Sequence, residues 1–273
     1  MLEVLATVRV PMSLDDMLAV SEIRNYDLEE IHSARAALAN WFLIEQQGEM
    51  MSLHKFLEIY YEEQVNKDPK RLEMIARDFG LHAYRMVMKL NDKLREVAQK
   101  DWWDEPIGVQ VTNDMFRYAV TAAKLLRSVG EDELAEQLPI KVSGTLREMA
   151  FYFYQIKKDY HKSLRYAEQW LQLNSSDDEV ALLRIRCYGS LGSKESMRIA
   201  RSLIAAIDGR KHSRRFEARL YREKAFIAEK SGLVEEAKAF YKLGIDVDQF
   251  SPYSENYIEY VEKVGIRSFC PSV

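Results

Sequence analysis

The side chains in this sequence that could do acid–base or metal chemistry are few and scattered. The histidines show no HExxH pairing and stand at five separate positions: His32, His54, His82, His161 and His212. His54 and Glu58 are four residues apart, so on a helix both would face one side and could share a metal ion. Two ligands are insufficient for a protein metal site, so an ordinary surface pair is favoured. We expect no metal and no cofactor.

Three groups of carboxylates resemble acid–base clusters: Asp15–Asp16, Asp101 with Asp104–Glu105, and Asp177–Glu179. The first and third precede helical patterns, where the positive end of the helix attracts acidic residues. The middle group lies in a predicted linker. The phosphate-loop, dinucleotide and serine-hydrolase motifs GxxxxGK[ST], GxGxxG and GxSxG are missing from the sequence. We therefore expect a protein that is not an enzyme; a catalyst built on these carboxylates and His54 is the less favoured alternative.

The two cysteines, Cys187 and Cys270, are too few for a disulfide framework and lack metal-ligand spacing. Cys187 lies near Arg184 and Arg186 on a predicted helix, and a small buried hydrophobe is favoured over a nucleophile. The opening MLEVLATVRVP has no basic leader and no small-residue cleavage site. These features favour a reducing, cytoplasmic location.

Basic residues concentrate between Arg184 and Lys230, although the chain as a whole is slightly acidic. This segment holds thirteen lysines or arginines and five acidic residues, so it carries +8 while the remainder carries −12 of the overall −4. Such polarity favours an acidic peptide, the N-terminal half of another copy, or the phosphates of nucleic acid as a partner. The alternative is a set of solvent-facing charges paired within helices, for example Glu195 with Arg198.

Composition and periodicity predict an all-α protein. Only 11 glycines and 6 prolines punctuate 273 residues, and no apolar run is long enough for a membrane span. Alternation at Leu2–Val10 predicts a short strand or unpaired arm, and Ser13 with Asp16 predicts a helix-starting cap. Apolar stripes then predict one helix from Leu28 to about Gln47–Gly48 and another from Met51 through Tyr61.

Further helices are expected on both sides of a linker at 100–108 (KDWWDEPIG). Another helix begins near Leu72 and is interrupted near Gly80. The adjacent rings of Trp102 and Trp103 are expected to anchor the linker onto one half of the chain. Residues 1–108 are predicted to form an irregular helical bundle and residues 109–273 a repeating region, in which Pro139 truncates one helix.

Three helical hairpins are predicted in succession between residues 146 and 252. Their turns fall near Lys158, Gly192 and Gly232, which are separated by 34 and then 40 residues. The six extra residues coincide with the polar segment Asp208–Ser213. A non-repeating helical bundle is the alternative.

The last hairpin carries the clearest pattern. Small residues at Ala225, Ala237 and Gly244 let its two helices approach closely, and the bulky Tyr241 fills the space beside them. Pro252 ends the unit.

This pattern resembles the tetratricopeptide repeat, whose units of about 34 residues are antiparallel helix pairs. The resemblance covers roughly residues 145–252: the third hairpin matches the family at three positions and the earlier two match in part. Lys224 stands where the family usually has leucine. The resemblance implies a right-handed α–α superhelix whose concave face is lined by the first helix of each pair.

In such a groove we expect six partner-binding residues: Tyr152, Gln155, Arg186, Arg219, Arg222 and Phe226. Arginines and aromatic rings could clamp carboxylates, because a guanidinium pairs with them through two parallel hydrogen bonds. A register error of one residue would rotate the set by about 100°.

The favoured hypothesis is a cytoplasmic adaptor whose groove binds an acidic or helical segment of a partner protein. The alternative is a helical-repeat protein that binds nucleic acid through residues 184–230. Self-association is left open.

Overall fold

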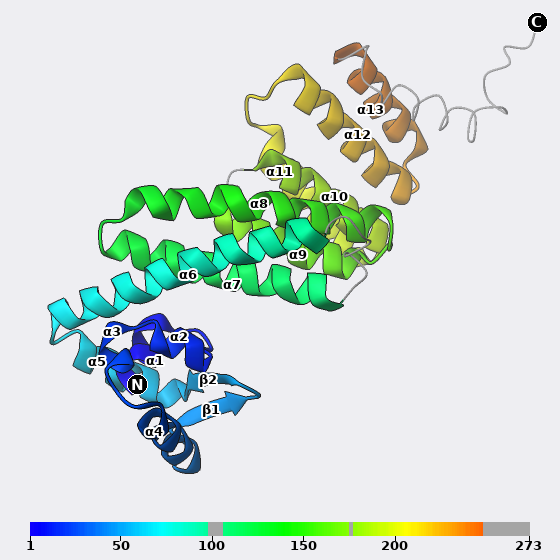
Figure 1. Cartoon of the computed structure of the whole chain (residues 1–273). Helices are drawn as coiled ribbons and strands as arrows, with labels where there is room; N and C mark the ends of the chain where they lie inside the picture. The colour runs from blue at the N-terminus through cyan, green and yellow to red at the C-terminus, as the bar shows by residue number, and fades with distance from the viewer. Residues whose placement is uncertain (98–105, 175–176, 248–273) are drawn as a thin grey trace, which may run out of the picture. The chain divides into compact units, whose positions relative to one another are not determined.

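The chain is mostly helical, as predicted. The computed structural model describes residues 1–97, 106–174 and 177–247, which form thirteen helices and one two-stranded sheet (Figure 1). It divides into two compact units, Met1–Leu146 (unit 1) and Arg147–Val273 (unit 2). The paired tryptophans at 102 and 103, predicted to anchor a linker, lie outside the described residues.

The N-terminal segment predicted as a strand is a helix, α1 (Leu2–Val8). Val4, Leu5 and Val8 are buried, and the helix contacts α5 and α6. The spacing of these three side chains also fits one helical face, and burying them against neighbouring helices outweighs the strand preference of valine. Arg9 ends α1 in the left-handed conformation, with φ of 57°.

The predicted cap at Ser13 is confirmed. The Ser13 hydroxyl accepts from the Asp16 backbone and the Asp16 carboxylate accepts from the Ser13 backbone, at the start of α2 (Leu14–Leu18). The next helices are α3 (Ser21–Arg24) and α4 (Leu28–Asn40).

A β-hairpin occupies the place where one helix was expected to end and the next to begin. Strands β1 (Ile44–Gln47) and β2 (Met50–Leu53) pair antiparallel, with Gln47 opposite Met50. The two-residue turn begins at Gly48, whose φ of 62° is the left-handed conformation such turns require. The predicted helix at Met51 is therefore wrong, and helix α5 (Lys55–Val65) begins after the strand.

Helices α6 (Pro69–Val97) and α7 (Pro106–Ser128) lie side by side (Figure 1). The expected interruption at Gly80 is absent from α6. A Cβ at Gly80 would lie 3.1 Å from the Leu126 side chain, so the glycine serves the close approach of α7. The predicted domain boundary at residue 108 falls within α7, whose packing on α6 places both helices in unit 1.

Helix α8 (Asp132–Gln155) continues through Pro139, where the sequence predicted its end. It runs across the division between the units, so its last turns, from Arg147, begin unit 2. Apolar residues on both sides of the proline, Leu138 and Val142, are fully buried. Their burial supplies the free energy that offsets the missing backbone hydrogen bond.

The three predicted hairpin turns are confirmed in unit 2. Lys158, Gly192 and Gly232 each adopt positive φ, the backbone conformation that ends a helix. The helices that follow α8 are α9 (Tyr160–Leu173), α10 (Asp178–Leu191), α11 (Lys194–Asp208), α12 (Arg214–Lys230) and α13 (Val234–Val247). Helix α10 contacts α11 of its own hairpin, α9 of the hairpin before it and α12 of the hairpin after it.

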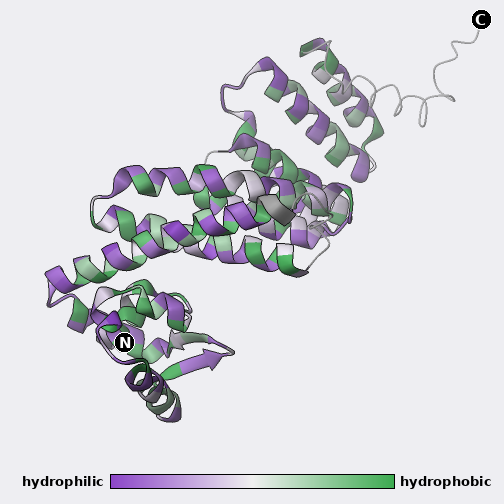
Figure 2. Ribbon diagram, viewed as in Figure 1, coloured by the Kyte–Doolittle hydropathy of each residue, from purple (hydrophilic) through white to green (hydrophobic). Residues whose placement is uncertain are grey.

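The helices of unit 2 are amphipathic, and Figure 2 shows hydrophobic and hydrophilic residues alternating around α12 and α13. Ala225, Ala237 and Tyr241 form the small core between these two helices, as the spacing predicted. Lys224, which replaces the usual leucine, donates to Asp208 at 2.5 Å while its ammonium lies 4.9 Å from the ring centre of Tyr221. Its aliphatic stem thus takes the packing role and Asp208 neutralises the charge.

Candidate functional site: an arginine-lined groove

The first helices of the three hairpins line two adjoining hollows of unit 2. One hollow has a volume of about 180 Å³ and the other about 440 Å³, and both are bordered by Phe151 and Arg219. We call the two together the arginine groove. Its lining comes from the last turns of α8, from α10, and from α12 with its N-cap Ser213.

Positive charge exceeds negative charge in the arginine groove. The charged lining residues are five arginines and two glutamates: Arg147, Arg186, Arg215, Arg219, Arg222, Glu179 and Glu223. Their net charge is therefore +3. Guanidinium groups favour planar anions, because each offers parallel N–H donors.

Arg186 and Glu223 form an almost buried ion pair in the lining of the groove. Nε and one terminal nitrogen of Arg186 each donate to a Glu223 oxygen at 2.6 Å. Burial opposes the charge of Arg186, but the Glu223 carboxylate outweighs that effect and raises the pKa of the guanidinium. The guanidinium carbon also lies 4.4 Å from the ring centre of Phe226. Arg186 therefore holds α10 against α12.

Arg219 is likewise engaged within the chain. Both terminal nitrogens of Arg219 donate to the Glu179 carboxylate, one of them at 2.5 Å. The two side chains join α12 to the start of α10. An anionic ligand would therefore meet Arg219 together with a carboxylate, which lowers the attraction that this arginine can offer.

Arg147 and Arg215 differ from Arg186 and Arg219 because both line the groove and are exposed. The guanidinium of Arg147 lies 5.9 Å from the ring centre of Phe151, which borders both hollows. Phe216 adds a second ring beside Arg215. Rings beside guanidinium groups give the groove an apolar surface for a ligand's side chains and donors for its carboxylates.

Four of the six residues predicted to bind a partner lie in the groove: Gln155, Arg186, Arg219 and Arg222. Tyr152 and Phe226 are not among the residues that line it. The Tyr152 ring packs edge-on against Phe153 and near the Lys157 ammonium. Phe226 packs between Arg186 and the backbone at Gly189, where a Cβ would come within 2.6 Å of its ring.

Several lining residues were missed by sequence reasoning, among them Arg147, Phe151, Glu179, Arg215 and Phe216. Each precedes, by one or two helical turns, a groove residue that was predicted on the same helix. The spacing of three or four residues was the available signal, and on α8 the expected register is displaced by one residue. Such a displacement rotates a side chain by about 100°, which accounts for Phe151 lining the groove in place of Tyr152.

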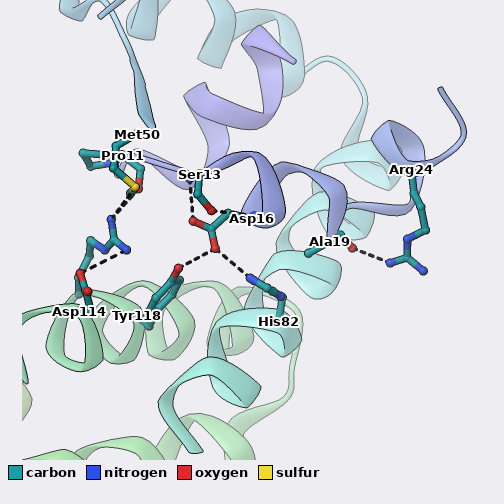
Figure 3. Close-up of polar contacts among 10 residues, drawn as sticks. Pro11, Ser13, Asp16, Ala19, Arg24, Met50, His82, Asp114 and Tyr118 are labelled. Atoms are coloured by element: carbon teal, nitrogen blue, oxygen red, sulfur yellow. Dashed lines mark hydrogen bonds and ion pairs between the residues drawn. The ribbon is translucent and has the colours of Figure 1, made fainter. Parts of the chain in front are cut away.

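A second polar cluster lies inside unit 1, where Asp16 of α2 meets His82 of α6 and Tyr118 of α7 (Figure 3). The Tyr118 hydroxyl donates to Asp16 Oδ1 at 2.7 Å, and His82 Nε2 lies 2.9 Å from the same oxygen. The backbone of Ser13 donates to Asp16 Oδ2 at 2.8 Å. Three helices are thus joined through one carboxylate.

The electrostatics of this cluster fit a structural role. Burial alone would raise the pKa of Asp16, but hydrogen bonds from His82, Ser13 and Tyr118 outweigh it and hold the pKa below its ordinary value. Burial and the Asp16 hydrogen bond together raise the pKa of Tyr118. Asp16 is 1% exposed, so its charge is out of reach of a dissolved substrate and remains compensated by its own neighbours.

The other sequence-level candidates for chemistry do not form a reactive site. Cys187 is buried beside the Ser163 hydroxyl, and burial raises the pKa of its thiol to about 11, which disfavours the nucleophilic thiolate. His54 precedes α5 as its N-cap and lies 4.0 Å from Glu45. Across residues 1–97, 106–174 and 177–247, no three metal-ligating side chains gather in one place.

Within the described ranges, each helix is too short or too polar to cross a lipid bilayer. No protein-family model matches the chain, and neither a curated protein nor a solved structure was found to match it. The function is therefore inferred from the geometry of the arginine groove.

Proposed function

We propose that this protein is a non-enzymatic adaptor whose arginine groove binds an acidic segment of a partner protein. In this proposal the three hairpins of unit 2 stack as a right-handed array of the tetratricopeptide kind. The observation that carries the proposal is that the first helices of all three hairpins, α8, α10 and α12, supply one lining with a net charge of +3.

The ion pairs within the protein give the arginines of the groove two different roles. Arg186 and Arg219 are held by Glu223 and Glu179, so they fix the spacing of the helices. Arg147 and Arg215, being exposed beside aromatic rings, are the better placed donors for a partner's carboxylates. A guanidinium already paired inside the protein gains less from an added anion than an exposed one does.

An acidic peptide fits this lining better than nucleic acid does. The basic residues of segment 184–230 do not form one continuous phosphate track: Arg198 pairs with Glu195 on α11, and Lys224 pairs with Asp208. The groove itself contains two carboxylates, which phosphates at close spacing would meet unfavourably. A peptide can place its acidic and apolar side chains between these charges.

The proposal is tested by the affinity of the full-length protein for a labelled synthetic peptide that alternates glutamate with leucine and phenylalanine. Fluorescence anisotropy of the peptide reports binding. The double substitution Arg147→Gln with Arg215→Gln is expected to weaken binding about tenfold or more, since hot-spot arginines typically carry such a share.

The matched control removes the same charge from the second helix of a hairpin. Lys194→Gln with Arg201→Gln, both on α11, should leave peptide affinity within about twofold, because neither residue lines the groove. Equal loss in both double variants would mean that net charge alone drives binding and would reject the groove. Tighter binding of a labelled RNA oligonucleotide, with steep salt dependence, would favour the nucleic-acid alternative instead.

A further inference from the structure

Helix α4 of unit 1 buries little of its surface. Ile31 is its one buried residue in the described structure, and the helix projects from the rest of unit 1 (Figure 1). At 13 residues α4 is near the length at which an isolated helix is marginal in water. A short helix gains most of its stability from packing, so a partner that covered the exposed surface of α4 would stabilise it.

The turn that follows α4 exposes two large aromatic side chains. Trp41 is 77% exposed and Phe42 is 84% exposed. Phe42 adopts φ of 54°, a left-handed conformation that bulky residues rarely take. Both the exposure and the strained backbone are unfavourable for the free protein, and such combinations occur at binding sites.

Helix α5 carries a second group of exposed apolar side chains. Phe56, Ile59 and Tyr60 are spaced three and four residues apart, so they share one face of α5, and all three are exposed. The Leu43 carbonyl accepts from the His54 backbone, which holds the residue after Phe42 against the start of α5. We call these five exposed side chains the aromatic face: Trp41, Phe42, Phe56, Ile59 and Tyr60.

The chain segment that carries the aromatic face is strongly acidic. From Asp27 to Glu63 the chain has eight acidic residues and two basic ones, Arg35 and Lys55, a net charge of −6. Two copies of this surface facing each other would repel, and an anionic membrane would repel it as well. The charge favours a partner that is both apolar and basic.

We propose that the aromatic face is a docking surface for a basic amphipathic helix of a partner protein. The apolar side of that helix covers Trp41, Phe42 and Phe56, while its lysines or arginines meet carboxylates of the acidic segment 27–63. This surface lies wholly in unit 1 and does not depend on the function proposed for the arginine groove. Aromatic anchors of this kind carry most of the binding energy in protein interfaces.

The test measures binding of the full-length protein to a labelled synthetic helix with leucines on one face and lysines on the other. Trp41→Ser with Phe42→Asn should weaken its binding about tenfold or more. Asparagine tolerates the left-handed conformation at position 42, so thermal stability should be kept or improved. The control, Ile140→Ser with Ile156→Asn, removes two exposed apolar side chains outside the aromatic face and should leave binding unchanged.

A charge variant separates the electrostatic part of the interaction from the apolar part. Glu45→Gln with Glu49→Gln should lower both the affinity and the salt dependence of binding, because each substitution removes a negative charge from the acidic segment 27–63. The proposal is overturned if the leucine–glutamate version of the helix binds equally well, or if the aromatic substitutions have no effect. It is also overturned if sedimentation shows a dimer that those substitutions dissociate, since a second copy would then cover the face.

Discussion

Removing Glu223 should strongly destabilise unit 2, because it would leave Arg186 charged and nearly buried. The side chains of Arg186 and Glu223 are 17% and 9% exposed and are joined by two hydrogen bonds of 2.6 Å. Breaking a buried pair by removing one partner costs about 3–5 kcal/mol, and the slight exposure of Arg186 places Glu223→Leu near the lower value. The expected loss is therefore about 3 kcal/mol.

Amide hydrogen exchange of peptides from α10 and α12 measures this loss for unit 2 separately from unit 1. A loss of about 3 kcal/mol corresponds to exchange faster by roughly a hundredfold for amides that exchange by opening of the unit. Changing both partners, Arg186→Met with Glu223→Leu, should recover most of the stability, since no charge is then left unpaired. If Glu223→Leu costs under about 1 kcal/mol, or if the double variant is no more stable than the single one, the pair does not hold α10 against α12.

Three further predictions concern residues outside the groove. Gly189→Ala should destabilise unit 2 by about 1–3 kcal/mol in exchange measurements, because its Cβ would lie 2.5 Å from Ile227 Cδ1; Gly209→Ala, which meets nothing within 4 Å, should not. Asp16→Asn should cost unit 1 about 2–3 kcal/mol at neutral pH in the same measurement, since charge-assisted hydrogen bonds are lost. Because folding lowers the pKa of Asp16, this carboxylate stabilises unit 1 above its unfolded-state pKa, and that stabilisation is lost as the pH falls through its folded-state pKa. The stability of the Asp16→Asn variant should therefore depend less on pH during acid unfolding of unit 1. An unchanged pH profile would contradict this. Iodoacetamide should label Cys187 only on unfolding, as resolved by peptide mass spectrometry, because the thiol is buried and its pKa is raised to about 11.

The helical hairpins of unit 2 could be predicted because their signals are local. Gly192 and Gly232 adopt the left-handed turn that glycine favours, and the small residues Ala225 and Ala237 pack between two helices. Helical periodicity also predicted part of the groove lining, because Arg186, Arg219 and Arg222 line the groove as expected. Phe151 lines the groove in place of the predicted Tyr152, because the rotation of a helix against its neighbours depends on packing and not on the position of the turn alone.

Elements whose conformation depends on distant contacts escaped prediction. Residues Leu2–Val8 alternate as a strand would, yet they form a helix because α5 and α6 bury one side of it. Pro139 stands inside a helix that buried neighbours support. The hairpin at Gly48 had a local signal in that glycine, but its strands are only four residues long and their pairing is a tertiary contact.

The sequence by itself determined the helical class, the hairpin turns of unit 2 and the excess of positive charge between Arg184 and Lys230. Only the tertiary structure decided which of those charges remain available. Glu223 and Glu179 come from helices remote in sequence to neutralise Arg186 and Arg219, whereas Arg147 and Arg215 stay exposed. The reason is that electrostatic attraction depends on distance and burial in space, and neither can be counted along the chain.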